Sequence, residues 1–210
     1  AVAIADIDEE KTRAVARALG NRHVAAPGDV ADEASVRDLV ATAKAGLGTI
    51  DVLINCAGVS DTFLPTLEQS VAHWRRIIDI NLTGTYLTCR AVAAEMLERR
   101  DGAIVNVSSI AGLVGLPFRN AYTASKHGVA GVTKSLAGEW GQHGVRVNAV
   151  SPGYVLTPMV QQLIDAGRVD PKVIQRRTPM GRFATPEEIG NVMVFLASPL
   201  AAYVNGAVIP

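Results

Sequence analysis

The sequence predicts an α/β fold in which one doubly wound parallel sheet carries helices on both faces. Short apolar runs recur along the chain, and each is followed by a segment whose apolar residues repeat every three or four positions. The runs are continuous rather than alternating, as in strands that are buried on both faces. The core is aliphatic, since 49% of the residues are hydrophobic and only 5% are aromatic. The expected strands are residues 2–5, 24–27, 51–55, 103–107 and 146–150, and the apolar run 51–55 is expected to be a central strand of the sheet.

Length and charge restrict the possible functions. The 210 residues are enough for one sizeable domain, and 20 basic residues balance 20 acidic ones. No basic run is interleaved with aromatic residues, so neither nucleic acid nor an anionic membrane is an expected partner. We find no apolar stretch of membrane-spanning length and no signal-peptide pattern, and therefore expect a soluble cytoplasmic protein.

The thiol and imidazole groups do not indicate a metal site or a disulfide. Cys56 and Cys89 lack paired spacing, and Cys56 is expected to act as a small buried hydrophobe. The four histidines have no mutual spacing typical of metal ligands and are expected to be structural: His23, His73, His127 and His143.

Capping residues mark the ends of several helices. Asp8 and Asp32 precede amphipathic segments, as N-cap residues do. Thr185-Pro-Glu-Glu188 reads as a capping box that starts a helix through Leu196. One long helix is expected over residues 70–100, with an irregularity at Asn81-Leu-Thr-Gly84, because asparagine and glycine disfavour regular helical geometry.

Three polar residues around the fourth expected strand suggest proton-transfer chemistry. Ser109 follows that strand, and Tyr122 and Lys126 share one face of the next helix because they are four positions apart. A tyrosine with its reference pKa of about 10 is a poor base near neutral pH, whereas a neighbouring ammonium favours the phenolate. Tyr122 could then act as a general acid/base, with Ser109 holding a carbonyl or carbinol oxygen.

These residues belong to a larger set of motifs that resembles the short-chain dehydrogenase/reductase family. Ser109 and Tyr122-Thr-Ala-Ser-Lys126 match the family's active-site spacing. Asn55-Cys-Ala57-Gly58, Asn81-Leu-Thr-Gly and Pro152-Gly153 with Thr157 stand in the family's order, although many members have a second asparagine where this chain has Cys56. The resemblance covers residues 1–210 and implies a single NAD(P)-binding domain with a Rossmann-like fold.

The resemblance also implies roles for individual residues. Segment 158–183, which has few periodic signals, would cover the substrate. The implied catalytic residues are Asn81, Ser109, Tyr122 and Lys126. The implied cofactor-binding residues are Asp6, Asp29, Val30, Asn55, Ala57, Gly58, Tyr122, Lys126, Pro152, Gly153, Val155 and Thr157.

Asp6 bears on the choice of cofactor. In a dinucleotide-binding sheet, an acidic side chain at the end of the second strand binds the adenosine ribose hydroxyls and repels a 2′-phosphate. We therefore expect NAD rather than NADP. A solvated loop aspartate is the alternative interpretation.

One strand of the expected sheet has no counterpart in the sequence. The order 3-2-1-4-5-6-7 requires a central first strand, whereas this chain opens on the second. A unit of roughly 30 residues, one strand and one helix, is expected upstream. It would carry the glycine-rich turn that holds the pyrophosphate. The chain also stops before the glycine pair that usually closes the family's last strand, so we expect these residues to be a domain truncated at both ends.

The expected activity is hydride transfer between NAD(H) and a secondary alcohol or ketone. Two alternatives remain open, an NADPH-dependent 3-oxoacyl-ACP reductase and a catalytically idle protein that senses the cofactor or acts as a scaffold. The resemblance also implies a homodimer or homotetramer, formed through the helices around residues 70–100 and 122–142.

Overall fold

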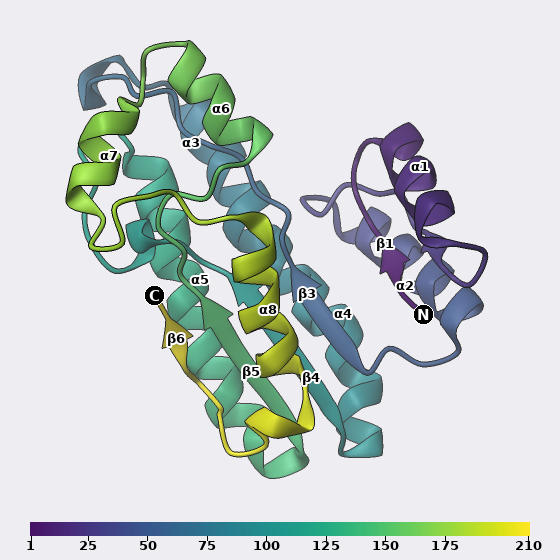
Figure 1. The fold of residues 1–210 in the computed structure, drawn as a ribbon. Helices are drawn as coiled ribbons and strands as arrows, with labels where there is room; N and C mark the ends of the chain where they lie inside the picture. The colour runs from purple at the N-terminus through teal and green to yellow at the C-terminus, as the bar shows by residue number, and fades with distance from the viewer.

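The computed structural model describes residues 1–210, and its elements follow the expected alternation of strands and helices (Figure 1). The strands are β1 (Ala3–Ile4), β2 (Val24–Ala25), β3 (Val52–Asn55), β4 (Gly102–Val107), β5 (Val145–Val150) and β6 (Val208–Ile209). The helices are α1 (Glu9–Leu19), α2 (Glu33–Leu47), α3 (Val71–Ile78), α4 (Gly84–Arg99), α5 (Asn120–Trp140), α6 (Pro158–Asp165), α7 (Pro171–Arg177) and α8 (Pro186–Ala197).

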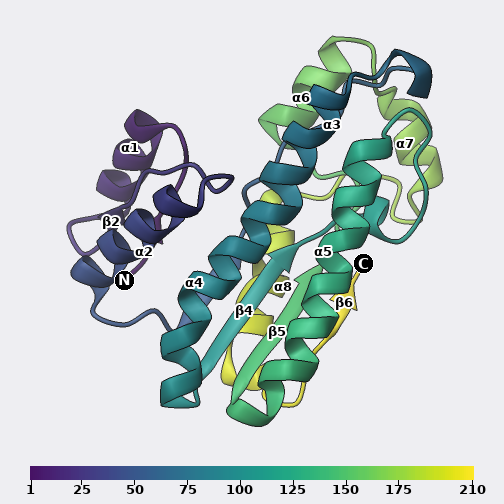
Figure 2. The same ribbon diagram turned by 180° about the vertical axis from the view of Figure 1, so that it is seen from behind.

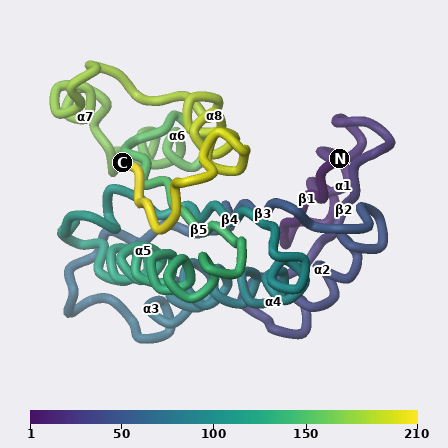
Figure 3. Tube along the Cα trace, turned by 90° about the horizontal axis from the view of Figure 1, so that it is seen from below, coloured from purple at the N-terminus to yellow at the C-terminus, as the bar shows by residue number.

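The elements form three layers with the strands in the middle. Seen from below, α2, α4 and α5 lie on one side of the strands, and α8 lies on the other side with α6 and α7 (Figure 3). All strand pairs are parallel. This confirms the α/β class, with helices on both faces of parallel strands.

The strands are divided between two sheets. β3, β4, β5 and β6 lie side by side in that order, with Leu53 opposite Ile104 and Ile104 opposite Val147. β1 and β2 form a separate pair. Together with α1 and α2 they make a small lobe, residues 1–47, which lies beside β3 and α4 in Figure 1 and beside α4 in the view from behind (Figure 2).

The structure corrects the expectation that residues 51–55 form a central strand. β3 pairs only with β4, and its other edge has no neighbouring strand. Val52 and Ile54 are each 40% exposed, whereas nearly every residue of β4 and β5 is buried. The expected order places a further strand between β1 and β3, and the two sheets separate at that position.

The main core lies between the four-stranded sheet and the helices on one of its faces. Ile104, Val145 and Val147 point to that face and pack with side chains of α2, α4 and α5. Val105 and Val150 point to the opposite face and pack with Leu196 of α8, because successive residues of a strand alternate between faces. Each fully buried aliphatic side chain of this kind contributes about 1.5–3 kcal/mol.

The expected helix boundaries are confirmed by capping contacts. The Asp8 and Asp32 carboxylates accept hydrogen bonds from backbone N–H groups in the first turns of α1 and α2, at 3.0 and 2.6 Å. The capping box of Thr185 and Glu188 is present at the start of α8. The irregularity near Asn81 is a π-helical turn, Asp79–Thr83, which joins α3 to α4.

Segment 158–183 contains more regular structure than its sequence indicates. α6 and α7 each begin with proline, after Thr157 and Asp170 as N-cap residues. Both helices are too short for a clear apolar period, so only their caps could have revealed them. No helix of the structure combines the length and apolar character that a membrane crossing requires.

Candidate functional site

The candidate site lies at the carboxyl ends of the parallel strands β3, β4 and β5. The backbone N–H of Ile110 donates to the carbonyl of Pro152 at 2.9 Å, which joins the loops that follow β4 and β5. The Ser108 hydroxyl donates to the carbonyl of Lys126 at 2.9 Å and so ties the end of β4 to α5. A Cβ added to Gly112 would lie 2.6 Å from the same carbonyl, so the loop after β4 packs directly on the helix backbone. Ligands of open parallel sheets bind beyond such strand ends.

Tyr122 and Lys126 lie one turn apart on α5. The Lys126 Nζ is 5.7 Å from the centroid of the Tyr122 ring and donates to the Val107 carbonyl at 2.7 Å. Lys126 is only 4% exposed, and burial lowers the pKa of its ammonium to about 8. Lys126 is therefore mainly a cation at neutral pH. Since an ammonium has three N–H donors, two have no partner in the protein.

Ser109 stands in extended conformation at the end of β4. Its Oγ accepts a hydrogen bond from the backbone N–H of Ala111 at 3.1 Å, and the hydroxyl donates to no protein group. A hydroxyl held in this way keeps its proton available for an oxygen atom of a ligand.

Asn81 lies fully buried in the π-helical turn and connects three parts of the site. Its amide oxygen accepts from the N–H of Val59 at 2.8 Å, and its Nδ2 donates to the Val59 carbonyl and to Ser125 Oγ, at 3.0 and 3.2 Å. A Cβ on Gly58 would lie 3.3 Å from Asn81 Oδ1 and 3.6 Å from Lys126 Nζ. The loop after β3, the π-helical turn and α5 therefore meet around Asn81 and Lys126.

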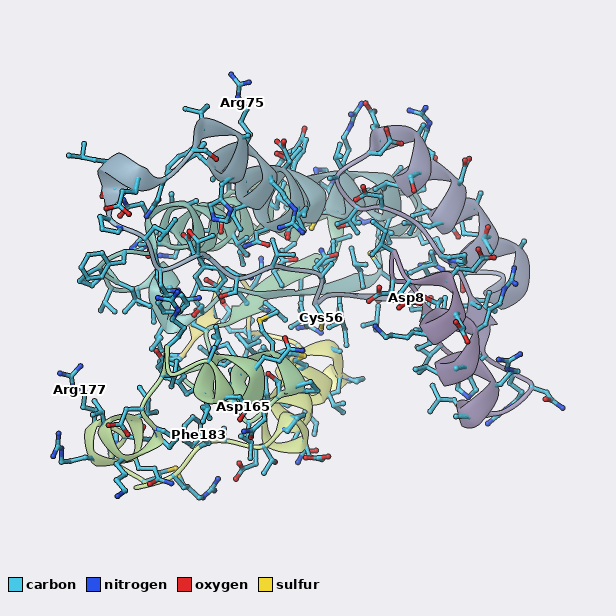
Figure 4. All side chains as sticks on the ribbon, turned by 90° about the horizontal axis from the view of Figure 1, so that it is seen from above. Asp8, Cys56, Arg75, Asp165, Arg177 and Phe183 are labelled. Carbon is cyan, nitrogen blue, oxygen red and sulfur yellow. The ribbon has the colours of Figure 1, made fainter.

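The loop after β3 presents backbone to the site, and the side chain of Asn55 points away from it. Asn55 Nδ2 donates to Asn106 Oδ1 at 2.9 Å, and Asn55 Oδ1 accepts from Thr88 Oγ1 at 2.7 Å. Only main-chain atoms of Asn55 can face a cofactor. The structure corrects the prediction for Cys56, which is exposed rather than buried because β3 lies at the edge of its sheet; Ala57 is exposed as well. Figure 4 shows Cys56 between the helices of the main body and the small lobe.

Asp6, Asp29 and Val30 gather at the strand ends of the small lobe. The N–H of Gly28 donates to the Asp6 carbonyl at 3.0 Å, so the loops after β1 and β2 are adjacent. Asp6 is exposed, and one of its carboxylate oxygens accepts from the Asp8 N–H at 2.9 Å. Asp29 Oδ1 accepts from the Ala31 N–H at 2.9 Å. A Cβ on Gly84 would lie 2.8 Å from Val30, which places these loops beside the π-helical turn.

The loop after β5 runs from the site into the covering segment. Gly153 is exposed, and a Cβ there would only just touch Ile110, at 4.0 Å. Val155 forms an isolated bridge with Ala184, which anchors the return of segment 158–183. The Thr157 hydroxyl accepts from the N–H of Val160 at 3.3 Å as the cap of α6, so its oxygen is partly occupied.

Two polar residues beside Tyr122 were not predicted. The Asp61 carboxylate accepts from the Tyr122 backbone N–H at 3.1 Å and contacts the ring of His73 at 2.9 Å. The Arg119 guanidinium lies over the Tyr122 ring, 4.3 Å from its centroid. Arg119 could have been found, because it precedes Tyr122 by three positions at the start of a helix. Asp61 is far away in sequence and gave no local signal.

These strand ends suit the nicotinamide half of a dinucleotide. Lys126 and Ser109 retain hydrogen-bond donors, and the buried Ser151 Oγ has no partner. Ala57 and Gly153 offer small, exposed backbone to a flat ligand. A parallel sheet with helices on both faces and this set of groups at its strand ends defines a Rossmann-like protein of the nucleotide-binding class.

Comparison with known proteins makes the class more specific. A family model described as Enoyl-(Acyl carrier protein) reductase matches residues 1–210. The chain belongs to the short-chain dehydrogenase/reductase family, a family of oxidoreductases that use nicotinamide cofactors.

Several relatives are dehydrogenases. The chain is 46% identical over 209 residues to D-threitol dehydrogenase of Mycolicibacterium smegmatis, covering 98% of this chain and 79% of that protein. It is 43% identical over 212 residues to cis-4-hydroxycyclohexanecarboxylate dehydrogenase of Sinomonas cyclohexanicum, covering 100% and 84%. A gluconate 5-dehydrogenase from Burkholderia cenocepacia, solved in complex with NADP and tartrate, superposes with a TM-score of 0.91 at 31% identity, covering 100% of this chain and 82% of that one.

Proposed function

We propose that this protein is a dehydrogenase or reductase that interconverts a secondary alcohol and the corresponding ketone with NAD(H). The observation that carries the proposal is the pair formed by Tyr122 and the buried Lys126 cation on one face of α5. The two curated relatives described above are named as dehydrogenases of hydroxyl-bearing substrates, which supports a reaction at a CH–OH group.

Each of the four proposed catalytic residues has a separate role. Tyr122 takes the proton of the substrate hydroxyl during oxidation and returns it during reduction. Lys126 stabilises the phenolate form of Tyr122, which is present before the proton is taken in oxidation and after it is given up in reduction. Ser109 donates a hydrogen bond from its free hydroxyl to the substrate oxygen. Asn81 holds the loop after β3 against α5 and so supports Lys126. A nicotinamide held by Lys126 and Tyr122 would supply the acceptor or donor of the hydride at the carbinol carbon.

The same proposal assigns the cofactor-binding residues. Lys126 and Tyr122 would bind the nicotinamide ribose. The backbone of Asn55, Ala57, Gly58 and Pro152, together with Gly153, Val155 and Thr157, would line the rest of the nicotinamide half. Asp6, Asp29 and Val30 would surround the adenosine. We propose NAD rather than NADP because the exposed Asp6 carboxylate would repel a 2′-phosphate.

We further propose that residues 1–210 act as one cofactor-binding domain in a cytoplasmic homodimer or homotetramer. Apolar side chains on α3 and α4 support an interface there, since Val71, Trp74 and Tyr86 are 64%, 41% and 45% exposed. Large exposed apolar side chains are candidates for contact surfaces when they lie together on one face.

Replacing Tyr122 with phenylalanine tests the proposed reaction. Since general acid/base catalysis contributes about 10²- to 10⁴-fold, Tyr122→Phe should lower kcat by at least about 100-fold on any alcohol that the wild type oxidises. The affinity for NADH, measured by calorimetry, should change little because the ring remains. Tyr203→Phe is the matched control, since Tyr203 is fully exposed. Turnover retained by Tyr122→Phe would refute the role of the phenol.

The cofactor assignment has its own test. Initial rates with NADH and NADPH at equal concentration should favour NADH, and Asp6→Asn should reduce that preference by about tenfold or more, as loss of a charge-assisted contact predicts. Asp38→Asn, on the exposed face of α2, should leave the preference unchanged. A clear preference of the wild type for NADPH would overturn the assignment and favour the 3-oxoacyl reductase alternative.

A further inference from the structure

Arg119 is a buried cation fixed beside the Tyr122 phenol. Its guanidinium carbon lies 4.3 Å from the centroid of the Tyr122 ring and 4.8 Å from that of Phe63, so both aromatic rings pack against it. Its Nη2 donates to Ser60 Oγ at 3.1 Å, and the residue is only 9% exposed. Because these contacts fix the planar group, its hydrogen-bonding edges have a set direction.

The positive charge of Arg119 has no counter-charge in the protein. Arg119 takes part in none of the ion pairs, and the oxygens of nearby Asp61 are used by Thr62, His73 and Tyr122. Arg119 Nε is buried without a partner, whereas Nη1 has no hydrogen bond and is not fully buried. An unpaired buried charge is costly, and a matching anion would reduce that cost.

The backbone around Arg119 is strained in a way typical of functional sites. Phe63, which packs on the guanidinium, has φ 61°, and Phe118, the residue directly before Arg119, has φ 66°. Bulky side chains rarely adopt positive φ, and such residues cluster where a ligand or a reacting group must be held. Two of them flank the same cation.

We propose that Arg119 binds an anionic group of the substrate, a carboxylate or another planar or tetrahedral oxyanion, through its Nη1 edge. The substrate class is then a hydroxy acid and its keto acid rather than a neutral alcohol. The proposal rests on the proposed function, since the anion on Arg119 and the hydroxyl at Tyr122 must belong to one molecule. The Arg119 guanidinium carbon lies 4.3 Å from the centroid of the Tyr122 ring, so the two groups are in direct contact and one small molecule beside them can reach both.

Matched pairs of substrates test the proposal directly. Three hydroxy acids are each compared with their methyl esters in the presence of NAD. They differ in the distance between the hydroxyl and the carboxylate: 3-hydroxybutyrate, 4-hydroxypentanoate and cis-4-hydroxycyclohexanecarboxylate. In at least one pair, kcat/KM of the wild type should favour the acid by about tenfold or more. Arg119→Gln should lower kcat/KM for that acid by about 10- to 100-fold, the range for losing a charge-assisted contact, and should change the value for the ester less than threefold.

Two further variants and thermal melts distinguish loss of the anion contact from loss of folding. Arg119→Lys keeps the charge but loses the planar fork, and it should give an intermediate loss for the acid. Arg75→Gln is the control on a surface cation, since Arg75 is exposed and projects outward from α3 (Figure 4). Thermal melts should show that all variants are folded.

The possible outcomes separate this proposal from the proposed function. Preference for the ester in every pair, or an equal loss for acid and ester in Arg119→Gln, would overturn the anion site while leaving the oxidoreductase activity standing. If no alcohol is turned over with either cofactor, the proposed function fails. Calorimetry with cyclohexanecarboxylate still decides the anion site in that case, because binding to the wild type should be lost in Arg119→Gln and kept in Arg75→Gln. Equal binding to all three proteins would overturn it.

Discussion

The buried charge of Lys126 lowers the stability of the folded protein. Its ammonium is almost wholly buried, has one hydrogen bond and faces no carboxylate. Burial lowers its pKa from 10.5 to about 8, which corresponds to about 3 kcal/mol of preference for the neutral form. The unfolded chain therefore holds this proton more tightly than the folded chain, and stability should rise with pH between about 8 and 10.5.

Replacing Lys126 with methionine should therefore separate stability from activity. Without cofactor, we expect Lys126→Met to raise the free energy of unfolding near neutral pH by about 1–2 kcal/mol, since the cost of the buried charge exceeds the lost bond to Val107. The gain should disappear as pH rises toward 10.5, and turnover should be abolished. Urea titrations across this pH range measure the first effect. Lys134→Met, on the exposed face of the same helix, should shift stability by less than about 0.5 kcal/mol. A destabilised Lys126→Met near neutral pH would contradict the argument.

At the residue scale, short-range spacing was the useful signal. Tyr122 and Lys126 were predictable because an i, i+4 pair on a helix must share a face. Asp61 was not, since it reaches Tyr122 across 61 positions of sequence. Cys56 was predicted to be buried because a free cysteine usually behaves as a small hydrophobe, whereas β3 lies at the edge of its sheet and leaves this residue exposed.

Among the elements, α5 depends on a cap supplied from elsewhere in the chain. Its N-cap residue, Arg119, makes no side-chain capping bond, and the Asp61 carboxylate instead accepts from the N–H of Tyr122 in the first turn. Burial raises the pKa of Asp61, but hydrogen bonds from Tyr122, His73 and Thr62 outweigh it and hold that pKa below its usual value. The loop after β3 thereby fixes the end of the helix that carries the phenol.

Asp61→Asn should accordingly weaken the fold in a pH-dependent way. The folded pKa of Asp61 is depressed, so its contribution is complete above the unfolded value of 3.8 and is lost as pH falls through the folded value. We expect a loss of about 1–3 kcal/mol near neutral pH, which shrinks below about pH 4. Chemical denaturation at both pH values measures the difference. Asp38→Asn serves again as the exposed control, and a loss that stays constant down to acid pH would contradict the ionic cap.

Elements were predictable where the chain carries explicit end signals. The capping box at Thr185 and the asparagine and glycine near the π-helical turn gave correct positions. α6 and α7 were missed because seven- and eight-residue helices hold too few apolar positions to show a period.

For the molecule as a whole, the division of the sheet sets the distribution of stability. β4 and β5 are paired on both edges, whereas β3 and β1 each have one free edge. The small lobe is joined to the rest through the chain between α2 and β3 and through α2, whose buried Val36, Leu39 and Val40 belong to the main core. Local opening should therefore require least free energy in β1 and β2, which form a sheet of only two strands.

Hydrogen exchange of the 210-residue chain tests this distribution. Amides of β4 and β5 should exchange slowest, and those of β1 and β2 should exchange faster by about 100-fold or more, because a two-stranded sheet has little core of its own. Mass spectrometry of peptides from each strand gives the comparison. Equal protection in β2 and β5 would show that the small lobe is held as firmly as the main body.

The overall fold could be predicted because continuous apolar runs and helical periods alternate along the whole chain. The strand order came from the family resemblance, and the separation into two sheets required the structure, since pairing depends on which strands are present to fill each position. The apolar composition of β3 is typical of a buried central strand, whereas in the structure β3 lies at an edge and is partly exposed. Composition therefore did not predict the position of this strand in the sheet.

The packing of Gly112 on the helix backbone has a consequence for changing the enzyme. Because that contact leaves no room even for a methyl group, the turn after Ser109 and the helix bearing Tyr122 cannot shift closer or be altered independently. New substrates are therefore best sought by varying the short helices α6 and α7, which are proposed to cover the substrate, because changes there leave the positions of Ser109 and Tyr122 as they are.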